Sequence, residues 1–228
     1  MAKLNPRQRY LQIALNGDLA DAQRIIARLP ASERIIIEAG TPLIKEHGIA
    51  AASRLNYWWQ KRLDGAKINA PAYIVADLKT IDRGATEAQM AARAGASAAV
   101  AMGQAPAETL NAFIAECEVL GIDAMVDMMN VDYSLNVLRK LKKQPAAVIL
   151  HRGVDEENFN REKQIPYHEI QRVKGNYGIL LAIAGGDTPR EVQRAFFNGA
   201  DIAVVWKNFY TATNDTVLLA QEFLRQTK

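Results

Sequence analysis

The sequence has very little of what several protein classes depend on. Its 228 residues include one cysteine, Cys117, which excludes an internal disulfide and a cysteine metal cluster. No stretch approaches the roughly 20 apolar residues of a membrane-spanning helix, and the N-terminal residues lack the apolar run of a secretory signal. The formal net charge is only +3, and lysines and arginines are scattered among acids, which disfavours nucleic acid as a partner. We therefore expect a cytoplasmic protein that binds neither membranes nor nucleic acids.

Short apolar runs and helical stretches alternate along the chain, the pattern of repeated strand-helix units. The predicted strands are Leu11–Leu15, Ile35–Glu38, Tyr73–Asp77, Ala98–Met102, Asp123–Asp127, Ala147–His151, Ile179–Ala184 and Ile202–Trp206. The predicted helices are Asp18–Leu29, Leu43–Leu63, Thr86–Arg93, Glu108–Leu120, Tyr133–Leu141, Tyr167–Lys174, Pro189–Phe197 and Asp215–Gln226. Strands this apolar, separated by helices, belong to a parallel sheet, and eight units favour closure into a (β/α)8 TIM barrel. Without any linker-like segment, residues 1–228 are expected to form one α/β barrel domain.

Residues that begin and end helices fall where this arrangement needs them. Asp18 and Asp215 are suitable N-caps, because a short acidic side chain accepts hydrogen bonds from the first free N–H groups of a helix. Gly95, Gly121 and Gly199 stand where a helix should stop before the next strand. The turn residues therefore agree with the hydrophobic periodicity.

Polar residues end several of the otherwise apolar strands. In barrels of this type the active site forms at the carboxyl ends of the strands, so these residues are candidates for catalysis and binding. They are Glu38, Asp77, Lys79, Asp82, Asp127, Asn130 and His151. One such carboxylate is easily a helix cap, whereas several at one barrel mouth indicate a site.

The third strand carries the strongest of these signals. Asp77 and Lys79 are two residues apart, so on an extended backbone both point into the barrel mouth, and Asp82 lies just beyond them. An acid beside a lysine keeps the lysine charged and can position a proton donor or a metal. The alternative is a simple ion pair that closes the top of the barrel.

Two further strand ends suggest a metal and a proton carrier. Glu38 and Asp77 together make a plausible Mg²⁺ site, because magnesium takes a few carboxylate oxygens and leaves its other positions to water and substrate. His151 has a neutral-range pKa suited to proton transfer, although a histidine ending a strand is often only a hydrogen-bonded core residue.

A phosphate site is expected after the last two strands, where glycine-rich turns and helix N-termini attract anions. Gly185 and Gly186 allow close approach of a backbone to an anion, and Lys207 supplies a positive charge, unless it is merely solvated. The polar stretch 158–166 follows the sixth strand, and it is either a lid over the mouth or an ordinary loop.

Five motifs together resemble the orotidine monophosphate decarboxylase superfamily, within it the branch of hexulose-6-phosphate synthase and 3-keto-L-gulonate-6-phosphate decarboxylase. The superfamily pattern Asp-x-Lys-x-x-Asp is present as Asp77, Lys79 and Asp82, and Glu38 resembles the sugar-phosphate branch. The motifs are Leu11-Gln-Ile-Ala-Leu15, Glu38-Ala-Gly-Thr-Pro-Leu-Ile44, Ala76-Asp-Leu-Lys-Thr-Ile-Asp82, Val126-Asp-Met-Met-Asn-Val131 and Ala182-Ile-Ala-Gly-Gly186. The stretch 126–131 looks more like the synthase than the ketogulonate enzyme.

The resemblance implies a Mg²⁺-dependent aldehyde-lyase that interconverts ribulose 5-phosphate plus formaldehyde with a hexulose 6-phosphate through an enediolate. It implies Glu38 and Asp77 as metal ligands, with Lys79, Asp127 and His151 as catalytic residues. It further implies a homodimer with shared active sites, in which the residue matching Asp82 reaches into the neighbouring site. Asn130 is assigned to the substrate site.

Two residues depart from the pattern of the family. Asn16 stands where an aspartate is usual after the first strand; a neutral amide can hydrogen-bond substrate but cannot act as a base. Trp206 replaces the phosphate-binding glycine after the last strand. These departures leave two alternatives open: a 3-keto-L-gulonate-6-phosphate decarboxylase-like enzyme, and a diverged barrel that binds a phosphorylated ligand without this catalysis.

Overall fold

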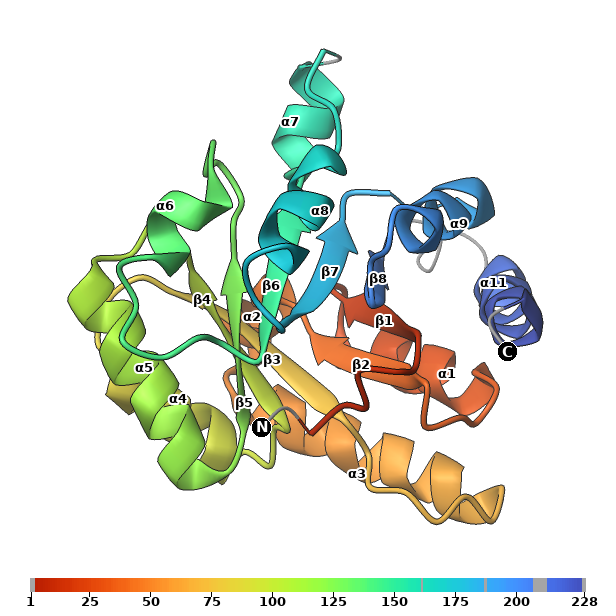
Figure 1. Ribbon diagram of the computed structural model, residues 1–228. Coiled ribbons are helices and arrows are strands. Elements are labelled where there is room, and N and C mark those ends of the chain that lie inside the picture. The colour runs from red at the N-terminus through yellow and green to blue at the C-terminus, as the bar shows by residue number, and fades with distance from the viewer. Residues whose placement is uncertain (1–2, 161, 187, 207–212, 227–228) are drawn as a thin grey trace.

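Eight parallel strands close into a barrel in the computed structural model, which describes residues 3–160, 162–186, 188–206 and 213–226. The strands follow one another around the barrel, and the last returns to pair with the first, so that Ile13 lies opposite Val205 (Figure 1). They are β1 Tyr10–Leu15, β2 Ile35–Ala39, β3 Ile74–Thr80, β4 Ala98–Met102, β5 Asp123–Asp127, β6 Ala147–His151, β7 Leu180–Ala184 and β8 Ile202–Val205. The predicted (β/α)8 barrel is confirmed.

Helices surround the barrel and connect its strands (Figure 1). They are α1 Leu19–Arg28, α2 Thr41–His47, α3 Ala50–Gly65, α4 Gly84–Arg93, α5 Ala107–Leu120, α6 Ser134–Leu138, α7 Val154–Phe159, α8 His168–Lys174, α9 Pro189–Phe197 and α11 Thr213–Gln226. The single helix predicted over 43–63 is wrong: it is divided into α2 and α3 at Gly48, whose φ of +73° a helix cannot continue.

Helix ends follow the predicted residues in most cases. Asp18 Oδ1 accepts a hydrogen bond from the Asp21 N–H at 2.7 Å and caps α1. Gly95, Gly121 and Gly199 have φ of +74°, +66° and +95°, the left-handed conformation in which glycine ends a helix. The predicted N-cap at Asp215 is wrong, because α11 already begins at Thr213.

Two groups of buried apolar side chains explain why the strands read as continuous apolar runs. Outward-facing residues such as Leu11 and Ile13 pack against the helices, and inward-facing residues such as Ile36 and Val100 fill the barrel. Each fully buried aliphatic side chain contributes about 1.5–3 kcal/mol. The interior of the barrel is thus filled with apolar side chains.

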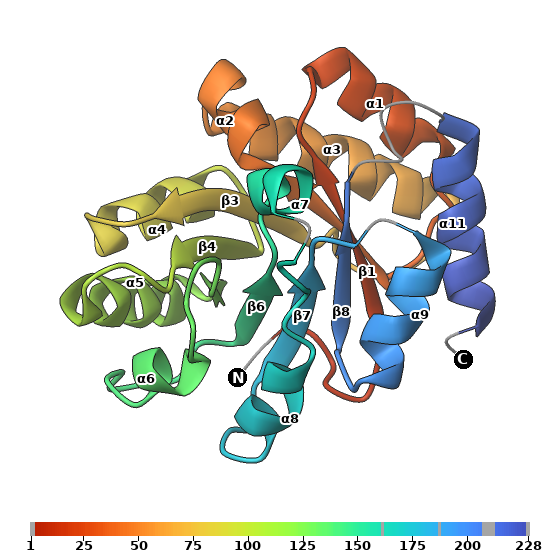
Figure 2. The ribbon, with the colours of Figure 1, turned by 90° about the horizontal axis from the view of Figure 1, so that it is seen from above.

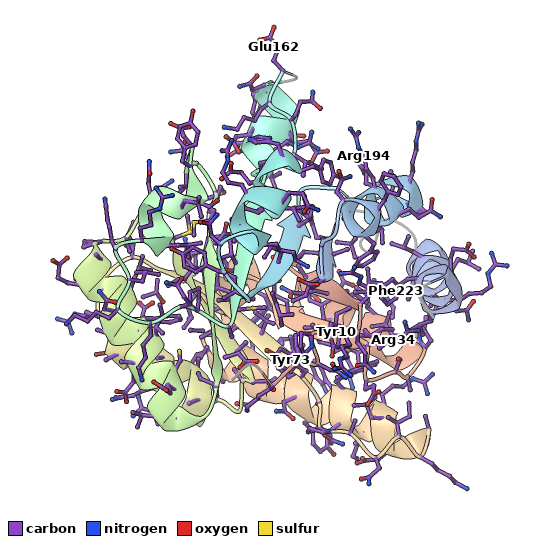
Figure 3. The ribbon with its side chains drawn as sticks, viewed as in Figure 1. Tyr10, Arg34, Tyr73, Glu162, Arg194 and Phe223 are labelled. Carbon is purple, nitrogen blue, oxygen red and sulfur yellow. The ribbon has the colours of Figure 1, made fainter. Side chains whose placement is uncertain are left out.

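Helix α7 is an addition that the sequence pattern did not predict. It begins three residues after β6 ends and rises beyond the barrel mouth, and Figure 2 shows it above the ring of strands. Residues 158 and 159, predicted as loop, are its last turn, and Glu162 marks the tip of the projecting segment (Figure 3). Across the described parts of the chain, we find no helix whose length and hydropathy suit a membrane crossing.

Candidate active site

A cavity of about 520 Å³ lies at the carboxyl ends of the strands. Its walls come from β1 through β8 and from the segments that follow them, including the start of α7. The polar and aromatic side chains around it are Gln12, Asn16, Glu38, Thr41, Lys45, Asp77, Lys79, Asp127, His151, Arg152 and Trp206. The sequence-predicted strand ends therefore converge on one mouth.

Asp127, at the end of β5, is the centre of the polar network. Its Oδ2 accepts a hydrogen bond from Lys79 Nζ at 2.9 Å and lies 2.8 Å from His151 Nδ1. Its Oδ1 accepts a hydrogen bond from the Met129 N–H at 2.9 Å. The Asp127 side chain is only 2% exposed. A buried carboxylate shared by a lysine and a histidine fixes both cations relative to each other.

These contacts change the proton affinities of the three groups. Burial opposes the charge of Asp127, but His151 and Lys79 outweigh it and hold the pKa of the carboxyl below its usual range. Burial likewise opposes the charge of Lys79, yet the neighbouring Asp77 and Asp127 raise its pKa. The pKa of His151 is also raised, because Asp127 offsets the effect of burial. The network therefore keeps the lysine charged and makes the histidine a stronger base than a free imidazole.

Asp77 and Lys79 meet as predicted, although the backbone between them is not a regular strand. Lys79 has a φ of +47°, and the register between β3 and β4 shifts between Ala76 and Thr80. Lys79 Nζ nevertheless lies 3.2 Å from Asp77 Oδ2. The irregularity turns the lysine towards Asp127 as well, so its ammonium group bridges two carboxylates rather than closing a single ion pair.

Glu38 and Asp77 form an acid pair at the ends of β2 and β3. Burial and the charge of Asp77 raise the pKa of Glu38 to about 7, although Gln12 Nε2 donates a hydrogen bond to Glu38 Oε2. Asp77 Oδ2 accepts a hydrogen bond from Thr41 Oγ1 at 2.9 Å, whereas the buried Asp77 Oδ1 has no hydrogen-bond partner in the part of the chain that the structure describes. Although Lys79 offsets part of its charge, the pair thus keeps one carboxylate oxygen, Asp77 Oδ1, that no group of the described residues uses.

The predicted Mg²⁺ fits this arrangement. Within the described ranges, we find no group of three or more histidine, cysteine, aspartate or glutamate side chains placed to hold a metal by themselves. Magnesium does not require such a cage, because it commonly uses one or two carboxylates and takes water and substrate oxygens for the rest. Two carboxylates facing an open cavity suit that mode of binding.

Of the other predicted site residues, some line the cavity and others lie outside it. Asn16 and Gly185 line the cavity, but Asp82 and Asn130 are exposed and Gly186 does not reach the cavity wall. Asn130 follows β5 with a φ of +56°, outside the network around Asp127. The predicted phosphate contact Lys207 lies outside the described residues.

Four polar residues that line the cavity were not among the predicted ones: Gln12, Thr41, Lys45 and Arg152. Gln12 is fully buried and shares the inward face of β1 with Ala14, so a polar residue inside an apolar run was the available signal. Thr41 begins α2 and holds Asp77. Arg152 follows His151 and donates to the Gly185 carbonyl at 2.6 Å. For Thr41, Lys45 and Arg152, no sequence pattern pointed to a role.

The sequence as a whole matches a known protein family. Residues 9–220 match the model of the Orotidine 5'-phosphate decarboxylase / HUMPS family, which is nearly the whole barrel. The chain belongs to this family. The resemblance expected from the Asp-Lys-Asp pattern is therefore confirmed.

Individual relatives narrow the comparison. The chain is 40% identical over 207 residues to the bifunctional enzyme Fae/Hps of Methanocella arvoryzae, covering 89% of this chain and 49% of that protein. It is 38% identical over 222 residues to the Fae/Hps enzyme of Methanosphaera stadtmanae, covering 95% of this chain and 52% of the relative. The chain thus spans about half the length of the curated relatives it matches.

A solved structure agrees with the fold. The 3-hexulose-6-phosphate synthase from Salmonella typhimurium has a TM-score of 0.78 and 23% identity, covering 95% of this chain and 99% of that one. At this identity the likeness shows the same barrel.

Proposed function

We propose that this barrel is a Mg²⁺-dependent aldehyde-lyase of the 3-hexulose-6-phosphate synthase type, which joins ribulose 5-phosphate and formaldehyde. The observation that carries the proposal is Asp127, whose single Oδ2 contacts both Lys79 and His151 beside an acid pair at one barrel mouth. Relatives about 40% identical are named for an Hps activity, which supports the same reaction.

Lys79 and His151 have different roles in this mechanism: His151 transfers a proton, and Lys79 stabilises negative charge. With His151 Nδ1 bound to Asp127, Nε2 takes the C1 proton of ribulose 5-phosphate to form the enediolate, and then donates that proton to the oxygen of formaldehyde as the carbon-carbon bond forms. Lys79 stays positively charged between Asp77 and Asp127 and stabilises the negative charge of the ribulose 5-phosphate enediolate. Both groups are fixed before the substrate arrives, which lowers the cost of ordering them.

Glu38 and Asp77 are the residues that would hold Mg²⁺. When bound there, the ion supplies Lewis-acid stabilisation of developing negative charge. Gln12 donates a hydrogen bond to Glu38, and Thr41 donates one to Asp77, so each carboxylate is held in its orientation.

The exposed position of Asp82 supports a homodimer with shared active sites. This residue is solvent-exposed and does not line the cavity of its own chain, which is the position expected of a residue that reaches into the site of a neighbouring copy. Mixing inactive Lys79→Ala and Asp82→Ala proteins should restore part of the activity, because hybrid dimers contain one site with both residues. No recovery in a mixture shown to exchange subunits would contradict the shared site.

The deciding experiment is an assay of the purified protein with ribulose 5-phosphate, formaldehyde and Mg²⁺. We expect formaldehyde consumption that stops on addition of EDTA and returns with Mg²⁺. The folded Lys79→Ala variant should lose at least about a thousandfold in turnover, since it loses a fixed charge at the reacting centre. Undiminished activity in that variant would refute the proposed mechanism.

The same protein separates the two alternatives. Release of CO₂ from 3-keto-L-gulonate 6-phosphate without consumption of formaldehyde would favour the decarboxylase-like enzyme. Binding of ribulose 5-phosphate with no turnover of either substrate would favour the diverged barrel.

A further inference from the structure

Arg152 occupies a fixed position at the edge of the cavity, directly after His151. Its side chain is 16% exposed and lines the cavity wall. Its backbone N–H donates to the Ala184 carbonyl at 3.1 Å, and its Nη2 donates to the Gly185 carbonyl at 2.6 Å. The guanidinium group is thus tied to the turn that follows β7.

The turn after β7 is packed directly against Arg152. Gly185 has a φ of +106°, and a Cβ at this position would lie 2.6 Å from the Arg152 carbonyl oxygen. A side chain there is excluded by both conformation and space. Gly185 therefore allows the arginine to approach the turn on which the sequence predicted phosphate binding.

The protein's own acceptors use only part of the hydrogen-bonding capacity and charge of the Arg152 guanidinium group. Among the described residues, the guanidinium group makes two polar contacts, and both are through Nη2: one to the Gly185 carbonyl and one to Glu157 Oε2 at 3.5 Å. Its Nε is buried and has no hydrogen-bond partner among them. Glu157, on α7, is 27% exposed, so water weakens its attraction for Arg152. Lys79, in contrast, already bridges two carboxylates.

We propose that Arg152 is an anchor for the phosphate group of the substrate. An arginine presents several donors in a planar arrangement that matches phosphate oxygens, and charge-assisted hydrogen bonds of this kind are strong. Lys45 also borders the cavity, but it is exposed on α2, and no ion pair or hydrogen bond to another described residue fixes its ammonium group. The anchor belongs at the β6–β7 edge, and this assignment rests on the proposed use of a sugar phosphate.

Calorimetric titration with inorganic phosphate tests the anchor without any turnover. We expect Arg152→Gln to weaken phosphate binding by about tenfold to a hundredfold, as for loss of a charge-assisted hydrogen bond. Arg225→Gln is the matched control, since it removes the same charge from an exposed arginine on α11, and it should bind phosphate as the parent does. Unchanged phosphate affinity in Arg152→Gln would overturn the proposal.

Steady-state kinetics separates an anchor from a merely structural arginine. Arg152→Gln should raise KM for ribulose 5-phosphate while leaving KM for formaldehyde unchanged. If the arginine were merely structural, its loss would lower kcat or raise both KM values. Phosphate binding that depends on Arg152 in a protein without lyase activity would support the anchor and refute the proposed reaction. Lyase activity in a protein whose phosphate binding does not depend on Arg152 would support the proposed reaction and refute the anchor.

Glu157→Gln provides a second variant that leaves Arg152 in place. Because the carboxylate partly neutralises the arginine, its removal should tighten phosphate binding by about twofold. Should Arg152→Gln not fold, this variant decides the matter: tighter binding supports the anchor, and unchanged or weaker binding overturns it.

Discussion

Asp123 and Asp127 stand at opposite ends of β5, and both are buried. Asp127 is held at the barrel mouth by two cations, Lys79 and His151. Asp123, at the other end, accepts the Lys3 N–H at 2.9 Å and the Tyr73 hydroxyl at 2.6 Å. The same residue type on one strand thus serves two purposes, and its partners decide which.

The partners of the two acids differ in their chemistry. Burial raises the pKa of Tyr73 well above its ordinary value, so this hydroxyl remains a neutral donor. Tyr10 lies near Tyr73 in the same lower part of the barrel, at some distance from α7 and the mouth (Figure 3). A groove of about 700 Å³ lies beside Asp123, so a cavity alone does not identify the active end. What distinguishes the mouth is one buried carboxylate, Asp127, that contacts both a lysine and a histidine.

The largest expected effect comes from replacing the acid at the mouth. Asp127→Asn removes the charge that holds both Lys79 and His151, and kcat should fall by about a hundredfold to ten-thousandfold. Steady-state assays of the folded variant measure this loss. A kcat within twofold of the parent would mean that the network is structural, like that of Asp123.

Replacing the acid at the opposite end should affect stability instead. Asp123→Asn puts an amide N–H where two donors now point, and we expect the free energy of unfolding to fall by about 1–3 kcal/mol. Urea denaturation measures the loss, and kcat of the folded protein should be unchanged. A large drop in kcat without loss of stability would break the distinction between the two ends.

Glu38→Gln tests the acid pair at the mouth. The amide is a poorer metal ligand than a carboxylate, so Mg²⁺ affinity should weaken by about tenfold or more. Protection of the fold against heat by added Mg²⁺ provides a reading independent of activity. If the metal titration of this variant matches the parent, the ion is held elsewhere.

The smallest expected effect is a pH dependence confined to the mouth. Because the pKa of His151 is raised in the folded protein, its ion pair with Asp127 contributes stability below the ordinary histidine pKa, and this contribution is lost as the pH rises through the folded value. The difference in unfolding free energy between the parent and His151→Gln should therefore be larger near about pH 6 than near about pH 9. A difference that grows with pH would contradict the assignment.

Most of the fold could be predicted because hydrophobic periodicity is a local property of the chain. Every strand was placed to within a few residues, since a strand buried on both faces must be apolar along its length. Helix α7 was missed because its six residues are mostly polar and none is buried, so it lacks an apolar face that a pattern could reveal. The division at Gly48 was missed because helical periodicity continues on both sides of it.

The sequence by itself determined the barrel and the set of acids, lysine and histidine at its mouth, because strand ends of a parallel barrel must meet at one edge. Only the tertiary structure decided which of them touch. The turn of Lys79 onto Asp127 depends on an irregular end of β3, and the placement of Arg152 against Gly185 joins two residues that are 33 positions apart in the chain. Contacts of this kind arise from packing between distant segments, which no local pattern encodes.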